Sequence, residues 1–250
     1  MPHPIGMNRS EAAATGPHPL VTAVAVTGIA LVGGAAIPLL PRRVRPLANV
    51  LTAAAALGVA RRRGLDPTDL GGAPGDMAHG ARAGAAAAGL AAAMVVGSVA
   101  APRTRGLFAD ARVTEASRAQ AAYDVLVRIP LTTALTEELL FRGVVLGAWR
   151  RAVGTPAAVA VSSFAFGLWH VLPALESHEH NPAGAGISAR VGGRPVHVGG
   201  TVAATAAAGA LFATLRLGSR SVVAPVVAHA AVNQLGYLAA RWAHAGDGQG

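Results

Sequence analysis

Uncharged apolar segments long enough to cross a bilayer are the feature that most constrains the fold of this chain. Residues 20–40 run for 21 positions without a charged side chain. A helix of about 20 apolar residues crosses the ~30 Å hydrocarbon core of a membrane. Comparable segments recur at 83–101, 155–175, 200–217 and 221–242. The sequence therefore predicts an all-α fold, a polytopic bundle of membrane helices.

Two further segments bring the expected number of transmembrane helices to about seven. Residues 123–149 are mostly apolar and are predicted to form one long helix. Residues 47–60 are shorter, because 14 residues rise only about 21 Å. This short segment either spans, with arginines at both ends reaching the headgroups, or re-enters the membrane. Since the two options reverse every later helix, the basic residues leave the orientation open.

The low content of charged residues supports a multi-pass protein of the cell membrane. Only 13% of the residues are charged and 52% are hydrophobic, whereas a soluble domain has about 25% charged residues. All 21 basic residues are arginine, and they flank the apolar runs as topology-setting loop residues do. No basic patch is interleaved with aromatic residues, so nucleic acid is not an expected partner. The absence of cysteine excludes disulfides and thiolate metal sites.

The composition changes along the chain predict four stretches and several loops. The stretches are a flexible N-terminal tail at 1–19, N-terminal membrane helices with their loops at 20–120, a membrane core at 121–242 and a polar C-terminal tail at 243–250. Residues 64–80 are rich in glycine and proline and are predicted to form a loop. Residues 102–122 are charged and are expected to be a partly helical connection outside the hydrocarbon. Residues 176–198 form a further predicted loop.

Two adjacent acids, Glu137 and Glu138, lie inside the apolar segment 123–149. A charged side chain at the centre of a membrane helix costs roughly 2.5–3.5 kcal/mol on insertion scales, so two acids there indicate a use for them. Arg142 follows Glu138 by four residues, a favourable spacing for an ion pair on one helix face. Glu137 points about 100° away and is predicted to face the bundle interior, where a carboxylate can act as a general base or acid.

Two other apolar segments carry polar side chains at helical spacing. Phe166 and His170 share one face of their segment, and His229 and Asn233 share a face of theirs. A neutral imidazole can accept a proton, and an asparagine amide can donate to a developing oxyanion. The predicted chemistry is peptide hydrolysis by a water that Glu137 and His170 activate. His229 and Asn233 would then stabilise the tetrahedral intermediate.

Other interpretations of the same residues remain open. Glu138 and Arg142 can be a purely structural ion pair, and a single membrane histidine often only joins two helices by a hydrogen bond. A proton-coupled transporter also uses buried acids and histidines, but the chain shows no internal repeat. A non-catalytic membrane partner or immunity-type protein with the same fold is a further alternative. The segment His178-Glu179-His180 is interpreted as part of a solvated loop rather than a metal site.

The three motifs together resemble a known family. The segments EELLFRG (137–143), FGLWH (166–170) and HAAVN (229–233) resemble the EExxxR, FxxxH and HxxxN motifs of the CPBP intramembrane proteases. This is the CAAX protease and bacteriocin-processing, or Abi, family, and the resemblance covers roughly residues 115–240. It implies a multi-pass bundle with a buried site in the catalytic core 121–242. It also implies an endopeptidase whose substrate is a membrane-associated peptide or protein, either lipidated and CaaX-like or carrying a leader peptide.

Carried over by motif position, the resemblance assigns a role to each residue. Glu137 is the water-activating acid and His170 its partner. His229 and Asn233 are the remaining site groups. The supporting residues implied by the motifs are Glu138, Arg142 and Phe166.

The resemblance leaves the cofactor open. Family naming includes the term metalloprotease, and Glu137, His170 and His229 would supply three ligands for a divalent metal such as zinc, with water as the fourth. The chain has no HExxH motif, and the same groups can activate water without a metal. We lean towards the metal-free reading as an expectation.

Overall fold

The computed structural model describes residues 18–108, 110–180, 186, 189–190 and 192–247, and all regular structure in these residues is helical. The N-terminal half contains α2 (Pro19–Ala36), η1 (Ile37–Leu39), α3 (Arg45–Arg62), α4 (Pro67–Leu70), η2 (Pro74–Asp76), α5 (Met77–Ala100), α6 (Pro102–Arg105), η3 (Gly106–Phe108) and α7 (Ala111–Thr114). The C-terminal half contains α8 (Arg118–Tyr123), η4 (Asp124–Ala134), α9 (Leu135–Glu138), η5 (Leu139–Val145), α10 (Leu146–Val153), α11 (Thr155–Trp169), α12 (Val171–His180), α14 (Arg194–Ser219) and α15 (Val223–Asp247). The predicted all-α fold is confirmed.

Five helical segments of the described chain are long and apolar enough to cross a membrane. They are Pro19–Leu39, Pro67–Ala100, Thr155–His178, Arg194–Ser219 and Val223–Ala243. The helix α3, which at 18 residues is longer than the predicted segment 47–60, is not among them, and it carries Arg45, Arg61 and Arg62 at its ends. The helix that holds the two acids is also not among them. The number seven therefore stays a prediction, whereas a bundle with several membrane-spanning helices is what the structure supports.

The acidic helix is continuous from α8 through α10. Ser117 caps its start by accepting a hydrogen bond from the backbone N–H of Gln120. The helix thus begins at Arg118, five residues before the predicted start at 123. It ends at Gly154, whose φ of 86° suits a residue without a Cβ. Two stretches, η4 and η5, are π-helical, and the short α-helical turn α9 between them holds both acids. Such π-helical turns are frequent at functional sites.

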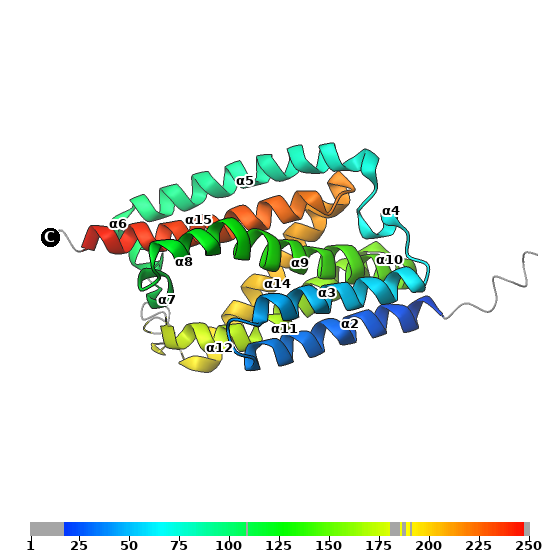
Figure 1. Ribbon diagram of the computed structural model, residues 1–250, viewed down its shortest axis with the longest axis horizontal. Coiled ribbons are helices and arrows are strands. Elements are labelled where there is room, and N and C mark those ends of the chain that lie inside the picture. Colours follow the sequence, from blue (N-terminus) through cyan, green and yellow to red (C-terminus); the bar gives the residue numbers. More distant parts are fainter. Residues whose placement is uncertain (1–17, 109, 181–185, 187–188, 191, 248–250) are drawn as a thin grey trace, which may run out of the picture.

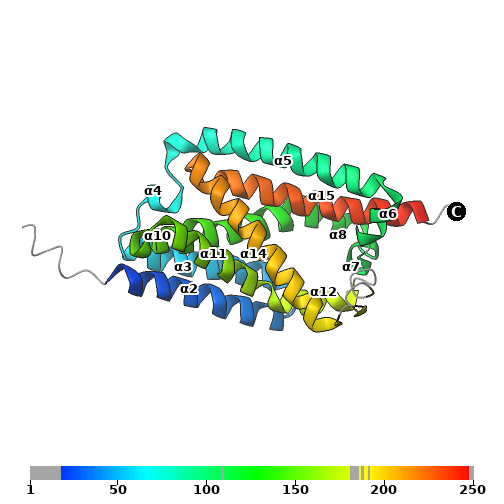
Figure 2. The same ribbon diagram turned by 180° about the vertical axis from the view of Figure 1, so that it is seen from behind.

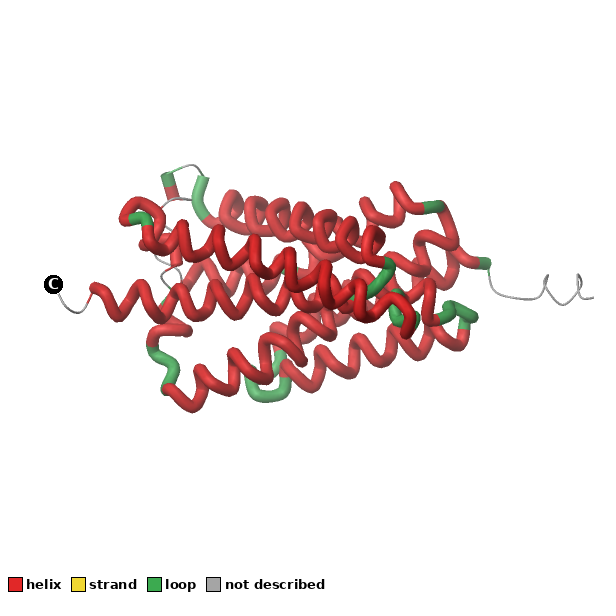
Figure 3. The backbone as a smooth tube through the Cα atoms, turned by 90° about the horizontal axis from the view of Figure 1, so that it is seen from above, coloured by secondary structure: helices red, strands yellow, loops and turns green. Residues whose placement is uncertain are grey.

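The helices run roughly along the long axis of the molecule (Figure 1 and Figure 3), and α5 packs along α15 while α2 packs along α3. The acidic helix lies between these two pairs (Figure 1). Seen from behind, α14 crosses the bundle obliquely over α11 (Figure 2). Glu137 and Glu138 therefore lie on the most central helix, which α15 and α11 both contact.

The predicted loop at 64–80 is partly helical in the structure. Asp66 and Asp69 form a reciprocal capping box around α4, so the backbone there has its hydrogen bonds satisfied. Arg216 of α14 donates to the carbonyl oxygens of Thr68 and Asp69. A Cβ on Gly71 would lie 2.1 Å from Nε of Arg216, which explains a glycine at this position. The loop is thus anchored to α14 rather than free.

The predicted loop at 176–198 is shorter than expected. α12 continues to His180 and α14 begins at Arg194, so much of the segment extends the flanking helices. The predicted connection at 102–122 is partly helical, as expected, through α6, η3, α7 and the start of α8.

Candidate active site

Glu138 and Arg142 form an ion pair within the acidic helix. Nη1 of Arg142 lies 3.1 Å from Oε1 of Glu138, and both side chains are fully buried. This confirms the pair that the four-residue spacing predicts. Because losing one partner of a buried pair leaves an uncompensated charge, the two residues depend on each other.

Aromatic rings from three helical segments surround the guanidinium of Arg142. Its central carbon lies 4.0 Å from the ring centroid of Phe166, 5.3 Å from that of Phe212 and 5.9 Å from that of Phe141. Nε and Nη2 of Arg142 are buried without a hydrogen bond, so these ring faces provide much of the contact with the rest of the cation. Arg142 thereby joins the acidic helix to α11 and α14.

His229 of α15 lies between the two acids. Its Nδ1 is 2.7 Å from Oε1 of Glu138, and its Nε2 is 4.0 Å from Oε2 of Glu137. The imidazole stacks on Phe212 and meets the edge of Phe166. His229 therefore contacts both carboxylates at once, from a helix about 90 residues away in sequence.

Glu137, like Glu138, has one carboxylate oxygen that is buried without a hydrogen bond. Its side chain is buried, and Oε2 has no hydrogen-bond partner among the described residues. Glu137 also lines a cavity of about 810 Å³, together with Thr133 and Trp169. Of the four predicted catalytic residues, Glu137 is the one that lines this cavity.

His170 contacts the ring of Phe166, as His229 does. Its Nδ1 is 2.8 Å from the carbonyl oxygen of Phe166, and the two rings are 4.6 Å apart between centroids. A carbonyl oxygen only accepts, so Nδ1 carries a proton and Nε2 of a neutral ring keeps its lone pair. No hydrogen bond or ion pair joins His170 to Glu137 within the described chain, and their partnership stays a prediction.

Asn233 follows His229 by one turn of α15 and is half-buried. Its amide makes no side-chain hydrogen bond to any described residue. The neighbouring Gln234 donates to the carbonyl oxygen of Val125, which fixes this part of α15 against the π-helical turns of the acidic helix.

The comparison with protein families covers the segment that contains this whole cluster. Residues 120–235 match the family described as type II CAAX prenyl endopeptidase Rce1-like. Over this segment the chain is similar to that family, which is one of proteases, that is hydrolases. The comparisons with curated proteins and with solved structures gave no match. The similarity, together with five apolar helices long enough to cross a bilayer, indicates a membrane protein.

Sequence reasoning missed several residues of this cluster. Phe212 and Gly209 of α14 belong to no motif, and an apolar helix gives no signal for which of its residues face a site. A Cβ on Gly209 would lie 3.1 Å from Nη2 of Arg142, so the glycine lets α14 approach the guanidinium. Phe141 lies inside the first motif, next to Arg142, and this position was the available signal that it belongs to the cluster.

The predicted metal ligands do not form a ligand set in this structure. No three His, Asp or Glu side chains of the described residues lie together in a way that could hold a metal ion. Each histidine uses only Nδ1 in a hydrogen bond, His229 with Glu138 and His170 with a backbone carbonyl, so the lack of a ligand set is a matter of position and not of occupied ring nitrogens. Glu137, His170 and His229 as arranged do not fit a divalent metal, so no catalytic step is derived through one.

The second histidine segment lies on α12. The ring of His178 is 4.9 Å from that of His197, and His197 Nε2 is 3.1 Å from Oγ of Ser177. The side chains of Glu179 and His180 lie outside what the structure describes. The solvated-loop interpretation of this segment was wrong as to structure, because residues 176–180 are helical.

Proposed function

We propose that this protein is an intramembrane endopeptidase that hydrolyses a peptide bond of a membrane-associated substrate, either lipidated and CaaX-like or carrying a leader peptide. The observation that carries the proposal is the position of Glu137. It is buried, one carboxylate oxygen is unbonded, it lines a large cavity, and Nε2 of His229 is 4.0 Å away. A base beside an open cavity is what hydrolysis needs.

Charge counting supports an acid–base role for the cluster. Two carboxylates and one guanidinium leave one negative charge in a buried site, and one further proton neutralises it. Since Nδ1–H of His229 can donate to Glu138, a second proton on Nε2 gives an imidazolium facing Glu137. In this state Glu137 is a carboxylate ready to accept a proton, and His229 is a donor.

The proposed reaction follows from these positions. Glu137 takes a proton from water while the water oxygen adds to the substrate carbonyl carbon, and the carbonyl electron pair moves to its oxygen. His229, with the amide of Asn233, donates hydrogen bonds to that oxyanion. The intermediate then expels the amine, which takes the proton back from Glu137. The products are a carboxyl group and an amine, and the enzyme is unchanged.

His170 has a separate part in the proposal. Because its Nδ1 proton is committed to the Phe166 carbonyl, Nε2 is free to accept a hydrogen bond from the attacking water. It would orient the water while Glu137 takes the proton. The reaction uses the side chains alone, without a metal.

The proposal is tested with purified protein in lipid nanodiscs. Cleavage of a fluorescence-quenched, farnesylated CaaX peptide and its unprenylated counterpart is followed for wild type and for Glu137→Gln. We expect a loss of about a hundredfold or more for the variant, in line with removal of a general base. Glu115→Gln is the matched control, because Glu115 is exposed and lies outside the cluster. Equal rates for wild type and Glu137→Gln would sink the mechanism.

A further inference from the structure

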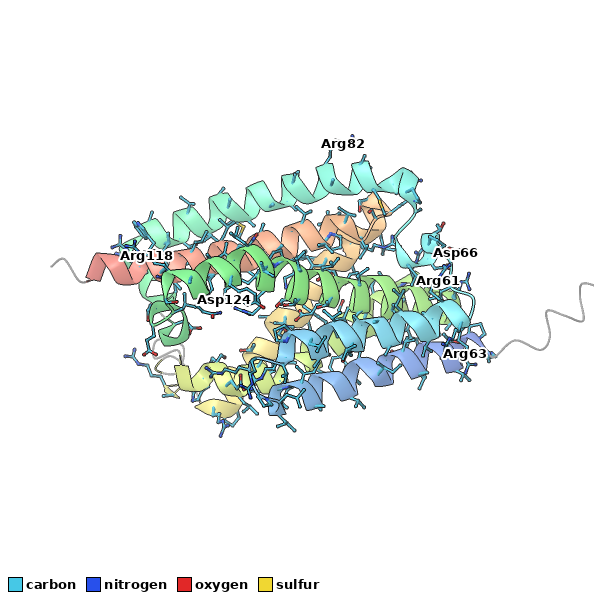
Figure 4. The ribbon with its side chains drawn as sticks, viewed as in Figure 1. Arg61, Arg63, Asp66, Arg82, Arg118 and Asp124 are labelled. Carbon is cyan, nitrogen blue, oxygen red and sulfur yellow. The ribbon has the colours of Figure 1, made fainter. Side chains whose placement is uncertain are left out.

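The cavity that Glu137 lines also contains a group of arginines at one end of the bundle. The turn between α2 and α3 contributes Arg42 and Arg43 to its wall, the first residue of α3 contributes Arg45, and η4 contributes Arg128. The turn, α12 and the segment before α8 meet around this region (Figure 1). Arg61 and Arg63, at the other end of α3, lie at the opposite end of the bundle from it (Figure 4). Arginines and the candidate base thus line the same cavity.

Arg45 holds the turn in place. It donates to the carbonyl oxygens of Leu40 and Pro38, and both of its terminal nitrogens lie 2.9 Å from the carboxylate oxygens of Glu176. This two-fold pairing with Glu176 ties the turn to α12. Arg45 is therefore already used, and the backbone that carries Arg42 and Arg43 is fixed.

The charges on the cavity wall do not all cancel locally. Its acids are Asp110, Asp124, Glu137 and Glu176. Glu176 is paired with Arg45, Asp124 is paired with Arg128, and Asp110 has an interaction of its own. Arg42 and Arg43 have no hydrogen bond or ion pair with any described residue. Two cations are therefore available on the wall of a cavity that Glu137 also lines.

Part of the remaining wall is polar and suits a peptide. Asn49, Gln120, Thr132 and Thr133 also line the cavity. Amide and hydroxyl groups suit peptide backbone groups better than an acyl chain. Arginine binds a carboxylate through two parallel hydrogen bonds, which fixes both position and direction.

We propose that Arg42 and Arg43 form an anion subsite that binds a carboxylate of the peptide substrate while its scissile bond lies at Glu137. This inference rests on the proposed function, and it assigns the carboxylate to the substrate's C-terminus or to an acidic side chain near it. The two arginines lie outside residues 120–235, so the subsite is a property of this chain beyond the segment that matches the family.

The test compares peptides that differ only in charge. In phosphatidylcholine nanodiscs, kcat/KM is measured for one quenched peptide with a free C-terminal carboxylate, for its amide, and for the amide with an added aspartate. We expect wild type to cleave the free acid about tenfold better than the amide, and Arg42→Gln/Arg43→Gln to cleave both equally. If wild type also prefers the aspartate-containing amide over the plain amide, the subsite binds acidic side chains of the substrate as well as its C-terminal carboxylate.

The controls separate charge from folding. Arg62→Gln/Arg63→Gln removes two exposed arginines at the other end of α3 and should keep the preference. Arg42→Lys/Arg43→Lys should keep part of it, since the charge remains. Equal cleavage of acid and amide by wild type would overturn the subsite and leave the endopeptidase intact.

If no peptide is cleaved, the proposed endopeptidase function is overturned, and the anion subsite is then tested by binding alone. Fluorescence anisotropy of the labelled acid and amide on wild type then reports the subsite directly, and equal affinity would refute it. The peptide subsite is also refuted if phosphatidylglycerol, added to the nanodiscs, abolishes binding of the acid peptide to wild type while the variant Arg42→Gln/Arg43→Gln no longer retains this lipid. The two arginines would then be a lipid headgroup site.

Discussion

Phe212 of α14 stacks on His229 of α15, with ring centroids 5.1 Å apart and ring planes 19° apart. The same ring lies 5.3 Å from the guanidinium of Arg142. Phe212, which lies outside all three motifs, therefore contacts both Arg142, the partner of Glu138, and His229, which lies near Glu137. Its position explains how α14, which carries no candidate catalytic side chain, takes part in ordering the cluster.

Replacing Phe212 with alanine should loosen the imidazole of His229. An aromatic stacking contact contributes about 0.5–1.5 kcal/mol, so we expect kcat to fall roughly threefold to tenfold. The effect should appear in kcat more than in KM, because Phe212 does not line the cavity. Phe164→Ala, an exposed phenylalanine on α11, is the matched control and should leave kcat unchanged.

Glu137 and Glu138 should separate stability from activity. Glu138→Gln leaves Arg142 as a buried cation without its counter-ion, and we expect a destabilisation of about 3–5 kcal/mol. Glu137→Gln should lower the melting temperature much less, because Oε2 of Glu137 has no hydrogen bond to lose. Thermal unfolding in detergent, read next to peptide cleavage, distinguishes the two. A larger loss of stability for Glu137→Gln would reverse the assignment.

Gly209→Ala should disturb the packing around Arg142. A Cβ at this position would lie 3.1 Å from Nη2 of Arg142 and 3.1 Å from the backbone Cα of Ser163. Such overpacking costs about 1–3 kcal/mol. Gly200→Ala on the same helix is the control, since nothing lies within 4 Å of its added Cβ. If the two variants melt at the same temperature, the close approach of α14 does not contribute to stability.

Chelation should not affect the reaction if the side chains act alone. We expect cleavage by wild type to survive treatment with 1,10-phenanthroline, because Glu137, His170 and His229 do not form a ligand set. Loss of cleavage that added zinc restores would contradict this expectation and would require the three residues to move together.

Asp66 should give part of the stability a dependence on acidic pH. The backbone N–H of Asp69 donates to its carboxylate, which lowers the pKa of Asp66 from its ordinary value of 3.8. A lowered pKa in the folded state means that the stabilisation is complete above about pH 3.8 and is lost as the pH falls through the folded value. Asp66→Asn should remove this dependence. Unfolding curves of both proteins between neutral and acidic pH test it.

Residue spacing predicted the interactions within one helix, whereas the contacts between helices could be seen only in the structure. The spacing of four residues on one helix predicted the Glu138–Arg142 pair. The apolar run 123–149 predicted the long helix that carries it. The sequence predicted that His229 stabilises the oxyanion, but it did not predict the hydrogen bond between His229 and Glu138. This contact joins positions 91 residues apart, so local spacing gives no signal for it. The helical turn at Pro67–Leu70 was also missed, because its capping box lies in a segment that glycine and proline mark as a loop.

The pairing of Glu138 with Arg142 inside one helix has a consequence for biogenesis. The helix 118–153 precedes α11, α14 and α15 in the chain, so it is synthesised before the rings and the imidazole that those helices contribute. An ion pair formed within the helix itself lowers the cost of inserting both charges from the start. The later helices then add their contacts in chain order: Phe166 first, Phe212 next, and His229 last. The acid–base pair is thereby completed only when the final helix is in place.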